Sequence, residues 1–258
     1  MTADVDLTQT SDDAVLGGRL RLRQPLRGHR VGHDAILLAA ATAARAGEHA
    51  ADLGAGVGAA GLALAQRVAG LELTLVEIDP ALAALAAENA DRNKLGDRVR
   101  AALCNAEDEV AMSGTGISPG SLDRVLMNPP FNDPRRQNVS PDPRRRLAHV
   151  ADPGLLGRWV ASASRLLKPQ GVLTLIWRAE GLDDVLAALA PAFGAVAVQP
   201  VYPRPEAAAI RVLVRAVKGG AGARSELPGL VLNGADGRPT AEAEAVMRGG
   251  EILALARL

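Results

Sequence analysis

The sequence predicts an α/β fold with a mostly parallel sheet of seven strands, an antiparallel last strand and a small N-terminal hairpin. Two observations predict it. Short apolar runs alternate with helical patterns from about residue 33 to 216, and this order favours right-handed crossovers between parallel strands. The chain is also 48% hydrophobic and 22% charged, so it can bury a full core.

Seven apolar segments are expected as the strands. They lie at residues 49–53, 73–76, 99–103, 123–127, 172–177, 196–201 and 210–217. Before and between them, helical spacing predicts helices at 33–45, 62–68, 80–94, 153–167 and 182–189. Asp79 is a good N-cap for the third helix, Pro80 suits its first turn, and Gly96 is expected to end it. The short Pro203–Pro205 connection predicts that the last two strands are antiparallel.

The chain is expected to form one domain with two appendages. Residues 1–30 should hold an acidic tail and a hairpin that turns at Gly17-Gly18. Residues 31–217 should form the main domain. Residues 218–258 should form a C-terminal extension packed on it, with a short strand near 230–232 and a helix after it.

Composition excludes several classes of protein. No run of about 18 uncharged apolar residues is present, so we expect no membrane span. The first 13 residues carry four aspartates, the opposite of the basic start of a signal peptide. The single cysteine, Cys104, excludes an internal disulfide and predicts a cytoplasmic protein. His29 and His33 lack a third ligand, so no metal site is expected.

Arginines gather in two segments of a chain whose formal net charge is zero. The first arginine cluster (residues 19–30) holds Arg19, Arg21, Arg23, Arg27 and Arg30, and the second (residues 135–146) holds Arg135, Arg136, Arg144, Arg145 and Arg146. Local basic patches on a neutral protein are typical of a face that touches a polyanion. Solvated surface arginine is the alternative interpretation.

A glycine-rich loop, residues 52–61, follows the first strand of the predicted sheet. Gly54 and Gly56 let the backbone turn sharply and approach a ligand, and the next helix offers N–H donors. Glu77 ends the following strand, where an acid that binds ribose is expected. The pattern therefore fits a nucleoside cofactor, and an NAD enzyme or a purely structural turn remains possible on this motif alone.

Two further residues help to identify the cofactor. Asp52 directly precedes the glycines, where its carboxylate can accept from the ammonium of S-adenosylmethionine but would repel a pyrophosphate. Asn105 follows the third strand, where its amide can bond the edge of an adenine. An ordinary turn asparagine is the alternative for Asn105.

The segment Asn128-Pro129-Pro130-Phe131 follows the fourth strand, beside the glycine-rich loop. An amino group on a base is a poor nucleophile because its lone pair is delocalised into the ring. The Asn128 carboxamide oxygen and the Pro129 carbonyl can each accept one amino hydrogen and so hold the nitrogen for attack. Phe131 offers a flat face on which a base can stack. The segment therefore predicts methyl transfer to an exocyclic amino or amide nitrogen, with a merely rigid loop as the alternative.

These motifs resemble those of Rossmann-like methyltransferases with an Asn-Pro-Pro-aromatic motif. Within that class, the chain is most similar to the bacterial tRNA adenine-N6 methyltransferases that modify a valine tRNA. Residues 30–38 and 233–240 resemble segments before and after the domain in that family. The resemblance implies that Gly32 and Asp34 lie against the cofactor. Asn105 departs from the family's usual aspartate, and residues 135–146 match no fixed family segment.

The resemblance implies a methyltransferase domain over residues 31–217, with S-adenosylmethionine as cofactor. The expected reaction is N-methylation of a base in structured RNA, at adenine N6 in tRNA, with both arginine clusters on the phosphates. The same catalytic motif also serves guanine N2, cytosine N4 and glutamine side-chain amides in proteins, so these substrates remain alternatives. An RNA-binding or cofactor-sensing module without turnover is a further one.

Overall fold

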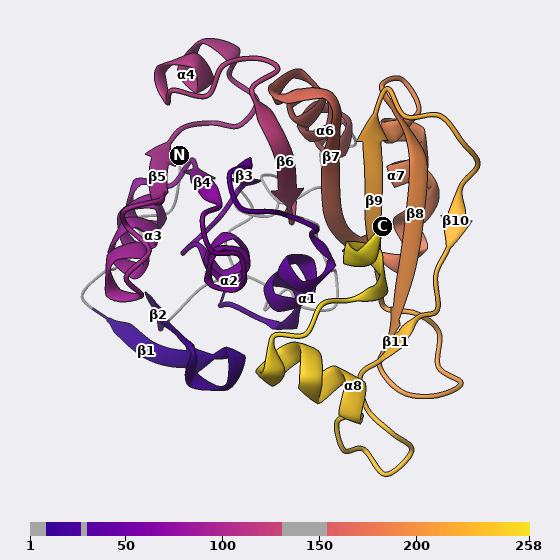
Figure 1. Cartoon of the computed structure of the whole chain (residues 1–258). Coiled ribbons are helices and arrows are strands. Elements are labelled where there is room, and N and C mark those ends of the chain that lie inside the picture. The colour runs from indigo at the N-terminus through magenta and orange to yellow at the C-terminus, as the bar shows by residue number, and fades with distance from the viewer. Residues whose placement is uncertain (1–8, 27–29, 131–153) are drawn as a thin grey trace, which may run out of the picture.

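A computed structural model describes residues 9–26, 30–130 and 154–258. Figure 1 shows a central sheet with helices on both faces and the hairpin β1–β2 beside α3. Phe131, Arg27 and the second arginine cluster lie outside the described residues. No helix within the described ranges is long and apolar enough to cross a membrane.

The central sheet has nine strands in the order β10-β8-β9-β7-β6-β3-β4-β5, with β11 also pairing with β8. Its strands are β3 (His49–Leu53), β4 (Glu72–Glu77), β5 (Val99–Leu103), β6 (Leu122–Met127), β7 (Leu167–Arg178), β8 (Phe193–Tyr202), β9 (Arg211–Lys218), β10 (Ser225–Glu226) and β11 (Leu230–Val231). Among the described strands of this sheet, only β9 runs antiparallel to its neighbours.

The predicted fold class is confirmed, with one correction to the strand count. The seven predicted strands are β3 to β9, and β10 and β11 add two short pairings on β8. The short strand expected near 230–232 is β11, whereas β10 has only two residues and shows no alternation that a sequence pattern could reveal.

The described helices flank the sheet. They are α1 (His33–Ala41), α2 (Ala59–Arg67), α3 (Pro80–Arg92), α4 (Glu109–Gly114), α6 (Leu155–Leu166), α7 (Leu182–Leu189) and α8 (Ala241–Glu244). The Asp79 cap of α3 is confirmed, because its Oδ1 accepts from the amides of Ala81 and Leu82 at 2.8 and 3.1 Å. The short helix α4, capped by Asp108, was not predicted from the sequence pattern.

Two helices end earlier than predicted. The helix expected over 33–45 stops at Ala41, because Thr42 takes an extended backbone and its Oγ1 donates to the Leu38 carbonyl at 2.7 Å. Helix α3 ends at Arg92. There Lys94, rather than Gly96, takes the positive φ of 59° that turns the chain.

The sheet separates two apolar cores, since successive side chains of a strand point to opposite faces. One core lies under α1, α2, α3 and the C-terminal extension, and Ile36, Leu62 and Leu213 are buried in it. The other lies under α4, α6 and α7, and includes Leu175 and Val185. Figure 1 shows these helices on either side of the sheet.

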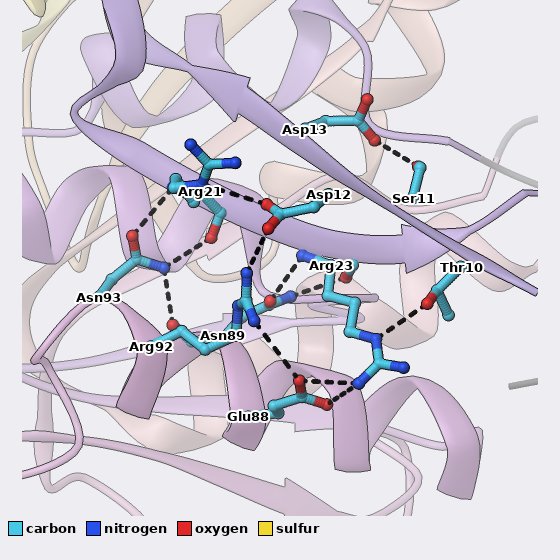
Figure 2. A network of polar contacts seen from close by, with 10 residues as sticks. All are labelled: Thr10, Ser11, Asp12, Asp13, Arg21, Arg23, Glu88, Asn89, Arg92 and Asn93. Atoms are coloured by element: carbon cyan, nitrogen blue, oxygen red, sulfur yellow. Dashed lines mark hydrogen bonds and ion pairs between the residues drawn. The ribbon is translucent and has the colours of Figure 1, made fainter.

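The hairpin consists of β1 (Thr10–Val15) and β2 (Leu20–Pro25), and two asparagines of α3 hold it in place (Figure 2). Asn89 accepts from the Arg23 amide at 2.7 Å and donates to its carbonyl at 3.0 Å. Asn93 makes the same pair of bonds with Arg21, at 2.9 and 2.7 Å. Asn89 and Asn93 are four residues apart in a helix, and Arg21 and Arg23 are two apart in a strand. Both separations are about 6 to 7 Å, so each asparagine faces one arginine.

The first arginine cluster is not the free basic surface that the sequence suggested. Three of its four described arginines are paired, as Arg21–Asp12, Arg23–Glu88 and Arg30–Asp13 at 3.3, 3.0 and 2.8 Å. Arg92 of α3 shares Asp12 as well (Figure 2). Hairpin pairing brings the acidic strand β1 against β2, and α3 adds Glu88, so carboxylates of both elements neutralise much of the cluster.

Candidate active site

Four predicted site residues lie in a row at one edge of the sheet. Asp52 lies in β3, Glu77 ends β4, Asn105 follows β5 and Asn128 follows β6. These strands are parallel neighbours in the order β6-β3-β4-β5, so their carboxyl ends meet at the same edge. Ligands of open α/β sheets bind outside this edge.

Glu77 organises the glycine-rich loop. Its Oε2 accepts from the Gly56 amide at 2.8 Å, and its Oε1 accepts from the amides of Ile78 and Asp79 at 2.9 Å each. The side chain is 7% exposed. A pyrophosphate would need loop amides such as that of Gly56 and would meet this carboxylate instead, so the contact argues against the dinucleotide alternative.

Asp52 lies beneath the loop and is 2% exposed. Its Oδ2 accepts from the Gly61 amide in the first turn of α2 at 2.9 Å. Burial raises the pKa of the Asp52 carboxyl to about 7; the Gly61 hydrogen bond opposes this rise and the nearby Glu77 adds to it. A cation at Oδ1 would favour the charged form, which fits the ammonium group that the sequence predicts here.

The loop glycines have different roles. Gly54 has a φ of 70°, and a Cβ there would overlap the Trp159 ring of α6, whose Cζ3 would lie at 2.9 Å. Gly56 has a φ of 57°, but a Cβ there would meet open space. Gly54 is therefore required by both conformation and packing, whereas Gly56 is required by conformation alone and faces the side that a ligand can approach.

Asn128 presents a buried acceptor without a donor. Its Oδ1 is buried and has no hydrogen-bond partner among the described residues. Pro129 beside it is buried and Pro130 is exposed, while Phe131 lies outside the described residues. A buried carboxamide oxygen without a partner costs about 1–3 kcal/mol, so a ligand donor is the natural explanation for it.

Gly32 and Asp34 open α1. Gly32 is its N-cap, with an extended backbone, and Asp34 follows in the first turn. The Asp34 carboxylate accepts from Arg211 Nε at 2.9 Å. Arg211 pairs with Arg178, the last residue of β7, so this ion pair also lies at the carboxyl edge of the sheet. The structure thus places Asp34 on the β7–β9 side, with one oxygen engaged by arginine.

Asn105 is exposed and its Oδ1 accepts from the Glu107 amide at 3.0 Å, in a local turn. Its amide nitrogen donates no hydrogen bond among the described residues and is the group left for a ligand. Sequence reasoning missed two apolar neighbours: Ile78 and Leu103 are 54% and 61% exposed at the ends of β4 and β5. Glu77 and Leu103 are register partners, so both apolar side chains flank the predicted adenine position.

Sequence reasoning also missed Asn89. It is fully buried, and its Nδ2 donates to the Val57 carbonyl of the glycine-rich loop at 3.0 Å as well as to β2. Its spacing from Asn93 was the available signal, because two asparagines one helical turn apart are unfavourable in a helix unless they bond something. Within the described ranges, no group of three or more His, Cys, Asp or Glu side chains is placed to hold a metal ion.

Residues 29–200 match the profile of a protein family described as the methyltransferase small domain. A relative from Porphyromonas gingivalis, named tRNA1(Val) (adenine(37)-N6)-methyltransferase, is 34% identical over 160 residues, which cover 60% of this chain and 61% of that protein. A relative of the same name from Bacteroides fragilis is 32% identical over 156 residues, which cover 60% and 62%. The chain therefore matches about three fifths of the length of these relatives.

Solved structures with the same fold are also known. A predicted O-methyltransferase from Agrobacterium tumefaciens superposes with a TM-score of 0.72 at 27% identity, over 85% of this chain and 98% of that one. TrmN from Thermus thermophilus superposes with a TM-score of 0.51 at 21% identity, over 71% and 47%. The second likeness bears on the fold alone.

Proposed function

The chain belongs to the methyltransferase small domain family, and from this premise we propose that it is an S-adenosylmethionine-dependent N-methyltransferase. Its proposed target is an exocyclic amino group of a base in RNA, namely adenine N6 in tRNA. The buried Oδ1 of Asn128 carries this proposal, because this acceptor has no donor within the described residues and lies at the ligand-binding edge of the sheet.

The residues at this edge fit S-adenosylmethionine. Asp52 would hold the ammonium group, Glu77 the ribose hydroxyls, and the Asn105 amide nitrogen the adenine edge. The exposed Ile78 and Leu103 would cover the adenine faces. Gly32, Asp34, Gly54 and Gly56 would line the same site. When bound, the cofactor supplies a methyl group on a sulfonium that is open to attack by nitrogen.

The residues that follow β6 prepare the nitrogen. Asn128 Oδ1 would accept one amino hydrogen and the Pro129 carbonyl the other, so that the lone pair turns away from the ring and toward the methyl group. Phe131 would stack on the base, which must leave its helix or loop to reach the pocket. The methylated nitrogen then loses its extra proton to water, so no strong base is needed.

RNA as the substrate is supported by the printed names of the relatives and by the second arginine cluster. We propose that residues 135–146 contact phosphates, with less help from the first arginine cluster because its charges are paired. A cytoplasmic location, expected from the single cysteine, suits a tRNA substrate.

Incubation with labelled S-adenosylmethionine and total RNA that lacks the modification tests the proposal. Nucleoside mass spectrometry should then find the label in N6-methyladenosine. Label in N2-methylguanosine or N4-methylcytidine would identify guanine or cytosine, rather than adenine, as the target base. Label in a protein glutamine would overturn RNA as the substrate. Replacing Arg144, Arg145 and Arg146 together should weaken tRNA binding and reduce its salt dependence.

A further inference from the structure

A cavity lies at the opposite edge of the sheet from the proposed methyl-transfer site. It has a volume of about 490 Å³ and opens at the amino ends of β6 and β7, under the C-terminal turn Ala254–Arg257. Arg124 lines it from β6, four residues before Asn128, which separates the two positions by about 13 Å along the strand. The methyl-transfer proposal makes no use of this cavity.

Within the described residues, five arginines line the cavity and no aspartate or glutamate does; Leu258, the last residue of the sequence, also lines it. The five arginines are Arg45, Arg67, Arg124, Arg215 and Arg257. Apolar walls come from Val172 and Val217 of the sheet and from Ile252. The volume lies within the range of small-molecule sites, which span about 300–1,000 Å³.

Two of the five arginines are occupied by protein groups. Arg124 forms a two-bonded pair with Glu48, at 2.9 and 2.6 Å. Arg67 donates to the carbonyls of Ala39 and Thr42, where it closes the end of α1. Their side chains help to shape the cavity, but their charge is partly satisfied.

The three remaining arginines of the cavity are not bonded in this way. The side chains of Arg45, Arg215 and Arg257 form no hydrogen bond or ion pair within the part of the chain that the structure describes. Nε of Arg215 is buried in addition, so water cannot replace the missing acceptor. Burial and the neighbouring Arg124 lower the pKa of the Arg215 guanidinium, as expected of a cation that lacks a counter-charge.

We propose that this cavity binds a phosphate-bearing anion, with Arg215 at its centre and Arg45 and Arg257 at its rim. The guanidinium fork matches the geometry of phosphate oxygens. Three unpaired cations in one cavity suit a di- or triphosphate better than a carboxylate, which carries a single charge. Solvated surface arginine does not explain Arg215, because its Nε is buried and has no acceptor among the described residues.

Isothermal titration of the full chain with inorganic triphosphate, at constant ionic strength, tests the site. The wild-type chain should bind one triphosphate. Arg215→Gln should weaken binding about tenfold or more, because it removes charge-assisted hydrogen bonds, and Arg215→Lys should weaken it less. Arg238→Gln is the matched control, since Arg238 is exposed and lies outside the cavity. Absence of triphosphate binding to the wild-type chain would overturn the proposal.

A second variant keeps the test valid if Arg215→Gln does not fold. Arg257 is exposed and its side chain is unbonded within the described residues, so Arg257→Gln should fold normally and still weaken triphosphate binding several-fold. Melting temperature checks folding in each variant. Equal dissociation constants for the wild-type, Arg257→Gln and Arg238→Gln chains would also overturn the proposal.

A competition experiment separates the two sources of phosphate. If an RNA backbone supplies it, unmodified tRNA should displace triphosphate, and Arg215→Gln should reduce the salt slope of tRNA binding by about one. If a free phosphorylated compound supplies it, triphosphate and tRNA should bind independently. Both experiments measure binding, so they give an answer whether or not the proposed methyl transfer is correct.

Discussion

The buried Asn89 amide nitrogen donates to the Val57 carbonyl at 3.0 Å, which ties α3 to the glycine-rich loop. The same side chain exchanges two hydrogen bonds with the backbone of Arg23 in β2. One residue therefore joins the hairpin, a helix and the loop on which cofactor binding is proposed. Because both its amide hydrogens and its oxygen are used, no smaller side chain can replace it.

Asn89→Ala should lower the free energy of unfolding by about 1–3 kcal/mol, because it leaves buried backbone groups without partners. It should also raise the dissociation constant for S-adenosylmethionine several-fold, since Val57 is released. Asn93→Ala is the control, because it loosens the same hairpin while Asn93 forms no hydrogen bond with the loop among the described residues. Urea unfolding and calorimetry measure the two effects. An equal loss of cofactor affinity in both variants would refute the link through Val57.

Asp52 should make the stability of the chain depend on pH. The pKa of the Asp52 carboxyl is about 7 in the folded chain, against an ordinary value of 3.8. Between these two pH values, the folded state therefore holds a proton that the unfolded state has lost. The stabilisation is therefore complete below pH 3.8 and falls as pH rises toward 7, by about 4 kcal/mol in all.

Asp52→Asn keeps an acceptor for the Gly61 amide but does not titrate. Its unfolding free energy should therefore fall less than that of the wild-type chain between pH 4 and pH 7. Urea unfolding at several pH values measures the difference between the two chains. Parallel pH profiles would show that the Asp52 carboxyl is not protonated in the fold.

Gly54→Ala should destabilise the chain more than Gly56→Ala does. Both substitutions place a side chain at positive φ, at a cost of about 1–2 kcal/mol. Only the first also drives a methyl group into the Trp159 ring, which adds about 1–3 kcal/mol of overpacking. Urea denaturation compares the two variants. A larger loss of unfolding free energy in Gly56→Ala would refute the packing of the Trp159 ring against Gly54.

Asn128→Ala should separate stability from activity. Because it removes a buried acceptor that has no partner among the described residues, the unfolding free energy should stay the same or rise by about 1 kcal/mol. Methyl transfer should nevertheless fall by about 10²–10³-fold, with cofactor affinity retained. Asn105→Ala should instead weaken cofactor binding more than it slows methyl transfer from the bound cofactor. A marked loss of stability in Asn128→Ala would mean that Asn128 has a structural role instead.

Local sequence patterns were sufficient to predict much of the fold. Strand and helix positions, the Asp79 cap and the antiparallel end of the sheet follow from short-range periodicity and turn chemistry. Asp52, Glu77 and Asn128 could be placed at one edge for the same reason, because each directly ends or follows a parallel strand. The limits of α1 and α3 were missed, since side-chain bonds rather than propensity end these helices.

The sequence by itself determined which residues reach the carboxyl edge of the sheet, since each lies at the end of, or directly after, a strand that the pattern predicts to be parallel. The tertiary structure alone decided what they contact there: Glu77 accepts from the Gly56 amide, while Asn128 Oδ1 has no donor in the part of the chain that the structure describes. It also decided where charge remains. Hairpin pairing neutralises arginines that look free in the sequence, whereas Arg215, which belongs to no motif of the sequence, lines a cationic cavity. Contacts between distant segments set these environments, and no local pattern encodes them.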